Sequence, residues 1–171
     1  MAISCGAGYG SYMIAEKLTG SFVIGVDDDQ KACSYASNNY KRGNLKYMPG
    51  DVTKWNFGTF DAIISFDTIE HILHREIMMQ NIVNNLSPDE FLILSTPCGR
   101  SETLLNPGWE HHKIEYSGVA LLDFMKRYFG TVLRPDDGSL PCIEFSDKIN
   151  KDRIRYPLKM NPILCEDPIQ F

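Results

Sequence analysis

The chain has 171 residues, of which 43% are hydrophobic and 23% charged, so it is long enough to bury one sizeable core. Seventeen Lys and Arg against 22 Asp and Glu give a formal net charge of −5, without a block of like charges. This balance argues against a basic face that binds nucleic acid, and no apolar run approaches the length that spans a bilayer. We expect one domain over residues 1–171, with no nucleic acid and no membrane among its partners.

The cysteines are odd in number and widely separated, at Cys5, Cys33, Cys98, Cys142 and Cys165. No close pair could bind zinc or form a redox dithiol, so we interpret them as buried thiols in a reducing cytoplasm. The first residues show neither a basic leader nor an apolar segment before a cleavage site. The sequence therefore predicts a cytoplasmic location.

Short apolar runs rich in β-branched and aromatic residues predict buried parallel strands at residues 22–26, 61–66 and 91–95. Residues 45–48 form a weaker candidate strand, which Pro49 and Gly50 end. Residues 3–5 resemble the end of a first strand that we expect to be incomplete at the amino terminus. Residues 160–165 are apolar enough for a final strand, and Pro162 favours an edge position for it.

Helical periodicity separates these strands. Apolar residues at offsets of three and four share a face over residues 33–40, 79–86 and 121–129. Ser11 is expected to cap a first helix over residues 12–19. Strands that alternate with helices predict an α/β fold with a doubly wound, mostly parallel, Rossmann-like sheet and helices on both faces. Ligands of such sheets bind at the carboxyl ends of the strands.

A glycine-rich segment, Gly6-Ala7-Gly8-Tyr9-Gly10, lies between the first strand fragment and the first helix. In a sheet of this kind, that turn brings the backbone closest to a nucleotide-type ligand, and glycine avoids a collision of Cβ with it. Tight packing of strand against helix explains the same glycines equally well. The segment indicates a nucleotide site when it is combined with other residues.

Two acidic positions follow the second and third predicted strands. Asp27 comes 21 residues after Gly6, where a carboxylate can accept hydrogen bonds from ribose hydroxyls. The alternative is that the acidic run caps a helix starting near Gln30, a role that we assign to Asp28 or Asp29. Asp51 could accept from an adenine amino group while Val52 covers the ring, or it could be an ordinary turn residue.

The segment from Phe60 to Ile72 reads FDAIISFDTIEHI. Together with the glycine segment, Asp27 and Gly50-Asp51-Val52, it resembles the class I S-adenosylmethionine-dependent methyltransferases, in their small-molecule branch. The resemblance covers Ile3 to about Leu94 in order and spacing. Residues 112–116 are similar to the family's HxxEY stretch after the fifth strand, and residues 161–165 resemble its last, antiparallel edge strand. Relative to the family, the chain looks shortened at its amino terminus.

The resemblance implies that S-adenosyl-L-methionine is the cofactor and that a small molecule accepts the methyl group. The residues implied at the cofactor come from four segments. They are Gly6, Ala7 and Gly8 beneath the methionine part, Asp27 at the ribose, Asp51 and Val52 at the adenine, and Phe66 and Asp67 beside the sulfonium and the methionine part. Cys5 and Asp28 complete the expected cofactor-binding residues.

The histidines follow the fourth and fifth predicted strands, near the expected acceptor pocket. His112 is our first candidate for a base or an acceptor-positioning group, and His71 is the second. The alternative for His71 is that it binds backbone and fixes a loop. We interpret His74 and His111 as surface residues. No histidine pair at helical i, i+4 spacing is accompanied by a carboxylate, so we expect no metal site.

Aromatic residues at Tyr9, Tyr12 and Trp109 could wall an acceptor pocket, or they could anchor the core and loops. Two other functions fit parts of the sequence. One is a degenerate, noncatalytic protein with a methyltransferase fold. The other is a nicotinamide-dependent short-chain dehydrogenase, which is less favoured because the third glycine is Gly10 and not residue 11, and because no tyrosine has a lysine four residues after it.

Overall fold

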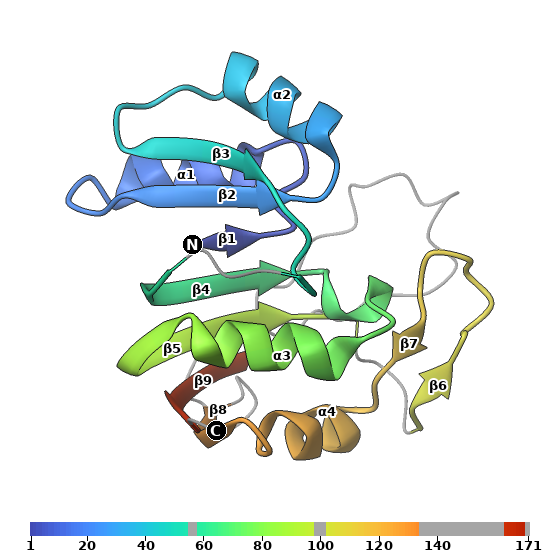
Figure 1. Cartoon of the computed structure of the whole chain (residues 1–171). Coiled ribbons are helices and arrows are strands. Elements are labelled where there is room, and N and C mark those ends of the chain that lie inside the picture. Colours follow the sequence, from blue (N-terminus) through green and yellow to red (C-terminus); the bar gives the residue numbers. More distant parts are fainter. Residues whose placement is uncertain (55–57, 98–101, 134–162, 170–171) are drawn as a thin grey trace.

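The computed structural model describes residues 1–54, 58–97, 102–133 and 163–169. Its strands and helices alternate along most of the chain (Figure 1). The strands are β1 (Ala2–Ile3), β2 (Val23–Asp27), β3 (Leu45–Pro49), β4 (Phe60–Phe66), β5 (Leu86–Ser95), β6 (Leu104–Leu105), β7 (Ile114–Glu115), β8 (Phe129–Leu133) and β9 (Ile163–Pro168). The helices are α1 (Tyr9–Lys17), α2 (Gln30–Asn39), the 3-10 turn η1 (Ile69–His71), α3 (Arg75–Asn84) and α4 (Gly118–Met125).

The main sheet has seven strands in the order β3-β2-β1-β4-β5-β9-β8. β1 to β5 pair in parallel, whereas β9 runs antiparallel to both β5 and β8. The predicted fold class is confirmed, including an antiparallel strand at the end of the chain. This last strand lies one place in from the edge, which β8 forms. Residues 160–162, which the sequence placed at the start of that strand, lie outside the described residues.

The short β1 lies in the centre of the sheet. Ala2 is in register with Gly25 of β2 and with Ile64 of β4, so two residues join the two halves of the sheet. Both residues of β1 are buried. Because the chain leaves the sheet directly after Ile3, residues 4–8 lie at the carboxyl edge of the strands, where a doubly wound sheet binds its ligands.

Helices cover both faces of the sheet, with α1 behind β2 and β3 and α3 in front of β4 and β5 (Figure 1). The apolar face of α3, which includes Met79, Ile82 and Val83, packs into one core with Leu92 and Leu94 of β5. A core of this kind holds the strand ends in fixed positions. It thereby fixes the geometry of the loops that follow them.

The predicted start of the first helix is wrong. α1 begins at Tyr9, three residues earlier than expected, and its N-cap is Gly8 with φ +89°. Ser11 lies inside the helix and is buried. Gly8 has a left-handed backbone conformation, which glycine adopts more readily than other residues. This conformation turns the chain into the helix, so a hydroxyl cap is not needed.

The other helical patterns predict the helices correctly, but the patterns continue beyond the carboxyl ends of the helices. Leu86 belongs to β5 and Phe129 to β8, although each fits the helical spacing of the residues before it. Both side chains are buried, so they face the same core from the start of a strand. Helical spacing alone does not separate this case from one more turn of helix.

A two-stranded ribbon of β6 and β7 lies beyond the carboxyl ends of β4 and β5 (Figure 1). The backbone N–H of Lys113, which precedes β7, donates a hydrogen bond of 2.6 Å to the carbonyl of Glu70 in η1. The ribbon therefore brings the stretch from Trp109 to Glu115 against the loop that follows β4.

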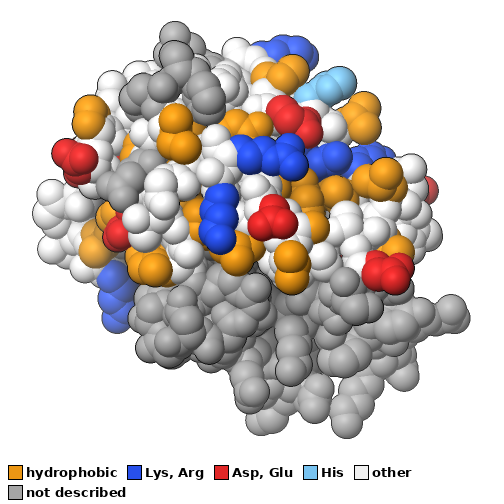
Figure 2. Space-filling model, turned by 90° about the horizontal axis from the view of Figure 1, so that it is seen from below, with side chains coloured by type: hydrophobic (Ala, Val, Ile, Leu, Met, Phe, Trp, Pro, Cys, Tyr) orange, Lys and Arg blue, Asp and Glu red, His pale blue; other side chains and the backbone are white. Residues whose placement is uncertain are grey.

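Acidic, basic and apolar side chains are interspersed over the described part of the face drawn in Figure 2. A face of this kind does not concentrate positive charge, as the net charge of −5 already indicates. In the described part of the chain, each helix is too short or too polar to traverse a lipid bilayer.

Candidate functional site

The glycine segment forms a tight loop between β1 and α1. Gly6 and Gly8 have φ of +52° and +89°, which favour glycine. A Cβ on Gly8 would lie 2.5 Å from Cβ of Ala36 in α2 and 2.8 Å from the ring of Tyr47 in β3. The Tyr47 hydroxyl also donates a hydrogen bond of 2.8 Å to the Gly8 carbonyl. The second glycine is therefore needed for close packing against α2 and β3.

Asp27 closes this loop from the end of β2. Its carboxylate accepts hydrogen bonds from the backbone N–H groups of Gly6, at 2.8 Å, and Asp29, at 3.0 Å. A carboxylate has about four lone-pair sites, so two remain for a ligand. The cap of α2 is Asp29, which accepts from the N–H of Lys31 at 2.7 Å. The predicted cap is therefore Asp29, and the ribose contact of Asp27 stays a prediction.

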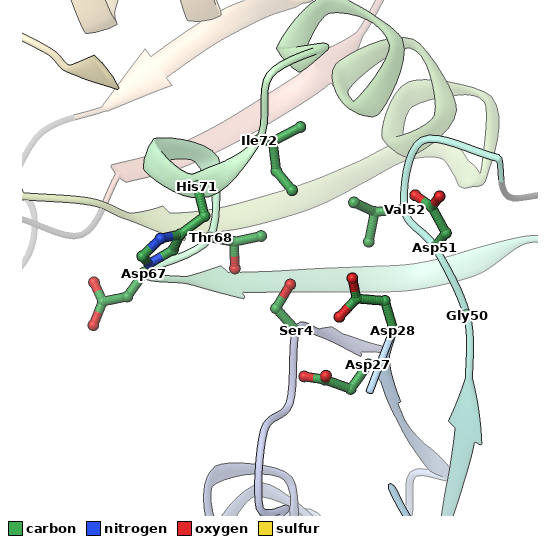
Figure 3. Close-up of a pocket in the computed structure, with 10 residues that line it drawn as sticks. All are labelled: Ser4, Asp27, Asp28, Gly50, Asp51, Val52, Asp67, Thr68, His71 and Ile72. Atoms are coloured by element: carbon green, nitrogen blue, oxygen red, sulfur yellow. The ribbon is translucent and has the colours of Figure 1, made fainter. Parts of the chain in front are cut away.

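A cavity of about 290 Å³ opens at the carboxyl ends of the parallel strands. Its walls come from the ends of β1 to β4 and from η1 (Figure 3). Asp67, Thr68, His71 and Ile72 lie toward one end, Gly50, Asp51 and Val52 toward the other, with Ser4, Asp27 and Asp28 between them. The volume is near the lower end of the roughly 300–1,000 Å³ typical of small-molecule sites.

Asp51 is both a turn residue and part of the cavity wall. Its Oδ1 accepts hydrogen bonds from the hydroxyl and the N–H of Thr53, at 2.7 and 2.8 Å. Its Oδ2 pairs with Nζ of Lys54 at 3.0 Å. These contacts, the Thr53 hydroxyl first, lower the pKa of Asp51 to about 2. The turn alternative is therefore correct locally, and it does not exclude a contact with a ligand.

Phe66 and Asp67 follow one another at the end of β4, but they differ in position. Asp67 lines the cavity with φ +48°, while its backbone N–H donates to the carbonyl of Ser95 at 3.0 Å. Loss of hydration raises the pKa of the Asp67 carboxyl. Phe66 is 49% exposed and is not part of the cavity wall. Cys5, Gly6, Ala7 and Gly8 also lie outside this wall and shape it through the loop.

The two histidines singled out from the sequence come together, although 40 residues separate them. The ring centroids of His71 and His112 lie 4.9 Å apart in an edge-to-face arrangement. Trp109 packs against His112 with a centroid distance of 4.2 Å. Tyr9 and Tyr12 pack against Tyr40 instead. Among the described residues, no aromatic ring contact joins them to the histidine cluster. His74 and the side chain of His111 are exposed, as expected.

Hydrogen bonds fix the ring nitrogens of both histidines. Nδ1 of His71 lies 2.9 Å from the carbonyl oxygen of His111. A carbonyl only accepts, so this nitrogen carries the hydrogen and donates. Nδ1 of His112 donates in the same way to Oε1 of Glu115, at 3.0 Å. In both neutral rings, the lone pair therefore lies on Nε2.

Glu70 belongs to the segment from Phe60 to Ile72, and no role was predicted for it. Glu70 is 1% exposed, and its Oε2 accepts a hydrogen bond of 2.8 Å from the Thr96 hydroxyl. Burial raises the pKa of its carboxyl. The ligand atoms of Glu70, His71 and His112 all lie within 4.8 Å of one another. In the sequence, the feature that could have indicated Glu70 as a site residue was its place next to His71, after the fourth strand.

Four further cavity residues had no role predicted from the sequence, namely Ser4, Gly50, Thr68 and Ile72. Ser4 adopts φ +51° at the end of β1, an unusual conformation for a residue other than glycine. Each of them directly precedes or follows a residue that was predicted, or lies within one turn of it. Ser4 lies within the first strand end predicted at residues 3–5, and extending the strand predicted at residues 61–66 by two residues would have included Thr68.

A family model described as a methyltransferase domain matches residues 1–94, more than half of the chain. The fold is also similar to solved structures. The [4+2]-cyclase SpnF has a TM-score of 0.73 and 11% identity, over 99% of this chain and 75% of that one. A methyltransferase from Methanosarcina mazei, dependent on S-adenosylmethionine, has a TM-score of 0.69 and 15% identity, over 99% and 92%.

The N-methyltransferase NodS from Bradyrhizobium japonicum, solved with S-adenosyl-L-homocysteine, has a TM-score of 0.64 and 13% identity, over 98% of this chain and 76% of that one. The sequence has no significant match among curated proteins. Because 837 solved chains match the fold, the structural likeness does not select an acceptor. The match of the family model to residues 1–94 shows the family. The chain belongs to the methyltransferase domain family, within the class I S-adenosylmethionine-dependent methyltransferases.

Proposed function

We propose that this chain transfers a methyl group from S-adenosylmethionine to a small-molecule acceptor. The observation that carries the proposal is the cavity at the strand ends, where Asp27 lies between Asp67 at one end and Asp51 at the other. In the cofactor, the ribose likewise lies between the methionine part at one end and the adenine at the other. Family membership supports the same cofactor.

The chemistry of the wall fits the cofactor. Asp27 retains lone pairs for two ribose hydroxyls, because its protein partners are two N–H groups. Val52 offers an apolar surface to a flat ring, and Asp51 lies beside it. Asp67, at the other end, places a negative charge where the ammonium and sulfonium groups of the methionine part would lie.

S-adenosylmethionine supplies a methyl group that is already activated on a sulfonium. The protein then has to hold the acceptor in line with that methyl and to exclude water. His71 and His112 lie at the Asp67 end of the cavity, and their Nε2 lone pairs provide acceptor-side groups. We therefore assign the acceptor to the space between the histidines and Asp67.

Calorimetric titration with S-adenosylmethionine and S-adenosylhomocysteine tests the cofactor site. We expect wild type to bind both, and Asp27→Asn to bind them at least roughly tenfold more weakly, because a charge-assisted hydrogen bond is worth about 1.5–3 kcal/mol. Asp29→Asn is the matched control, since it makes the same charge change two residues away and Asn caps helices as well as Asp does. Equal loss in both variants would contradict a ribose contact of Asp27.

Methyl transfer is then measured with small hydroxyl and amine acceptors by release of S-adenosylhomocysteine. Turnover that depends on His112 supports the full proposal. Cofactor binding by a folded chain without turnover on any acceptor would favour the noncatalytic alternative. A folded wild type that binds neither compound would refute the proposed function.

A further inference from the structure

The cluster of Glu70, His71 and His112 has the form of a metal centre. Its three ligand atoms lie within 4.8 Å of one another, at the Asp67 end of the cavity. Two imidazole nitrogens and one carboxylate oxygen suit divalent first-row transition metals such as Fe²⁺, Co²⁺ and Zn²⁺. We propose that Glu70, His71 and His112 bind a divalent transition-metal ion, and that this ion holds an oxygen atom of the methyl acceptor. The second half of this proposal rests on the proposed function.

The orientation of the rings supports binding. Metal-binding histidines usually donate their other N–H to a carboxylate or a backbone carbonyl, and both arrangements occur here. His71 uses the carbonyl of His111, and His112 uses the carboxylate of Glu115. Each bond leaves Nε2 as the atom with the free lone pair, which is the form that a metal requires.

The distances leave room for an ion between the ligands. Nε2 of His71 lies 3.8 Å from Oε1 of Glu70, which is longer than a hydrogen bond. Metal bonds of about 2.0–2.2 Å place neighbouring ligand atoms roughly 3–3.5 Å apart. Small side-chain rotations therefore bring the cluster to metal-binding distances. Thr96 already holds the Glu70 carboxylate in place through Oε2.

The electrostatics favour a cation. The carboxylate of Glu70 is buried beside His71, which lines the same end of the cavity as Asp67. A buried carboxylate is costly unless a positive charge compensates it. The positions around His112 include Glu115, a further acidic group. A divalent ion among these groups offsets their repulsion and explains why an acid is buried next to two imidazoles.

The cluster is open on the cavity side. His71 lines the cavity and its side chain is 38% exposed, whereas Glu70 and His112 form the buried side of the cluster. Three protein ligands leave positions that an acceptor hydroxyl can occupy. A divalent ion lowers the pKa of such a hydroxyl. An oxygen lone pair then forms the bond to the methyl carbon, the electrons of the S–C bond remain on sulfur, and the hydroxyl proton leaves to solvent.

Cobalt is the probe for the site, because bound Co²⁺ absorbs visible light. The chain, freed of any histidine tag and of metal, is titrated with Co²⁺ alone. We expect one equivalent to bind, and Glu70→Gln to bind at least roughly tenfold more weakly. Glu115→Gln, which alters the partner of His112, should lose roughly 10–100-fold. His111→Ala is the matched control, since it removes an exposed imidazole and keeps the carbonyl that His71 uses. Equal affinities for all four proteins would overturn the site.

A second measurement uses the wild-type protein alone, so it does not depend on whether the variants fold. Zn²⁺, which is diamagnetic, should shift the ring ¹⁵N signals of His71 and His112 and leave those of His74 and His111 in place. Equal shifts in all four histidines, or a shift in none, would overturn the proposal. Titration of the same sample with S-adenosylmethionine distinguishes failure of the metal site from failure of the proposed function. Cofactor binding without metal binding would refute the metal site alone, and metal binding without cofactor binding would refute the proposed function.

Discussion

The backbone N–H of Gly6 donates a hydrogen bond of 2.8 Å to Oδ2 of Asp27, which joins the glycine loop to the end of β2. Asp27 thus has a structural task besides the one proposed at the ribose. The same carboxylate orients the loop that precedes α1 and faces the cavity. A substitution here therefore changes the shape of the site as well as its charge.

This relationship predicts that Asp27→Ala destabilises the empty protein. Gly6 would lose its acceptor, and a hydrogen bond to a charged group contributes about 1.5–3 kcal/mol. We expect a lower free energy of unfolding in urea and faster hydrogen exchange of the Gly6 amide. Asp27→Asn keeps an oxygen acceptor and should lose less. Unchanged exchange at Gly6 in the alanine variant would contradict the structural role.

A second prediction concerns the packing of the loop. Gly8→Ala places a Cβ 2.5 Å from Ala36 and imposes φ +89° on alanine. We expect the free energy of unfolding to fall by at least about 2 kcal/mol, from overpacking and the left-handed backbone together. Gly10→Ala is the control, because nothing lies within 4 Å of its Cβ in the described structure, and alanine favours the helix there by about 0.5–1 kcal/mol. Similar losses in both variants would argue against this packing.

A third prediction follows from the contacts of Asp51. Hydrogen bonds from Thr53 and the pair with Lys54 lower its pKa to about 2, from an ordinary value of 3.8. A lowered pKa means that the stabilisation is fully present above pH 3.8 and is lost as the pH falls through about 2. We expect the carboxyl ¹³C signal of Asp51 to titrate with a midpoint near 2.

The Thr53 hydroxyl is the largest cause of this shift, which supplies a matched pair of variants. Thr53→Ala should raise the midpoint of Asp51, whereas Thr53→Ser keeps a hydroxyl and should leave it low. Because the Asp51 side chain is 38% exposed, the effect on stability is expected to stay below about 1 kcal/mol. A wild-type midpoint at 3.8 or above would show that these contacts do not persist in solution.

The thiol of Cys5 provides a fourth prediction. Burial raises its pKa from 9.0 to about 12, so its thiolate fraction at pH 8 is about a thousandfold lower than that of an ordinary thiol. We expect iodoacetamide to modify Cys5 far more slowly in the native protein than in 6 M urea. Peptide mapping by mass spectrometry measures both rates. Rapid modification of native Cys5 would mean that the loop after β1 opens readily.

Much of the parallel sheet could be predicted because its strands contain short apolar runs with buried or half-buried side chains, as in residues 62–64. The acidic positions at strand ends were also predictable, since topology brings them to one edge. The start of α1 was not, because a left-handed Gly8 replaced the expected hydroxyl cap. The end of α4 was missed because Phe129 satisfies helical spacing and yet begins a strand.

The histidine cluster was predicted only in part. Proximity of His71 and His112 depends on the β6–β7 ribbon, whose pairing of Leu104 with Glu115 is not visible in either segment alone. Glu70 was overlooked because an acidic residue in a sequence gives no sign of being buried. Its burial follows from the packing of η1 and from the Thr96 hydroxyl on the neighbouring strand end.

Tyr47 lies against two glycines, Gly8 at the start of α1 and Gly25 within β2. Its ring would lie 2.8 Å from a Cβ on Gly8 and 2.7 Å from one on Gly25, and its hydroxyl donates to the Gly8 carbonyl. The three positions therefore constrain one another's size, although 39 residues separate the first from the last. A glycine loop transplanted from another protein of this fold would need its own residue at position 47 to come with it. The unit that could be exchanged between such proteins is a loop together with an aromatic side chain two strands away, and not the glycine motif by itself.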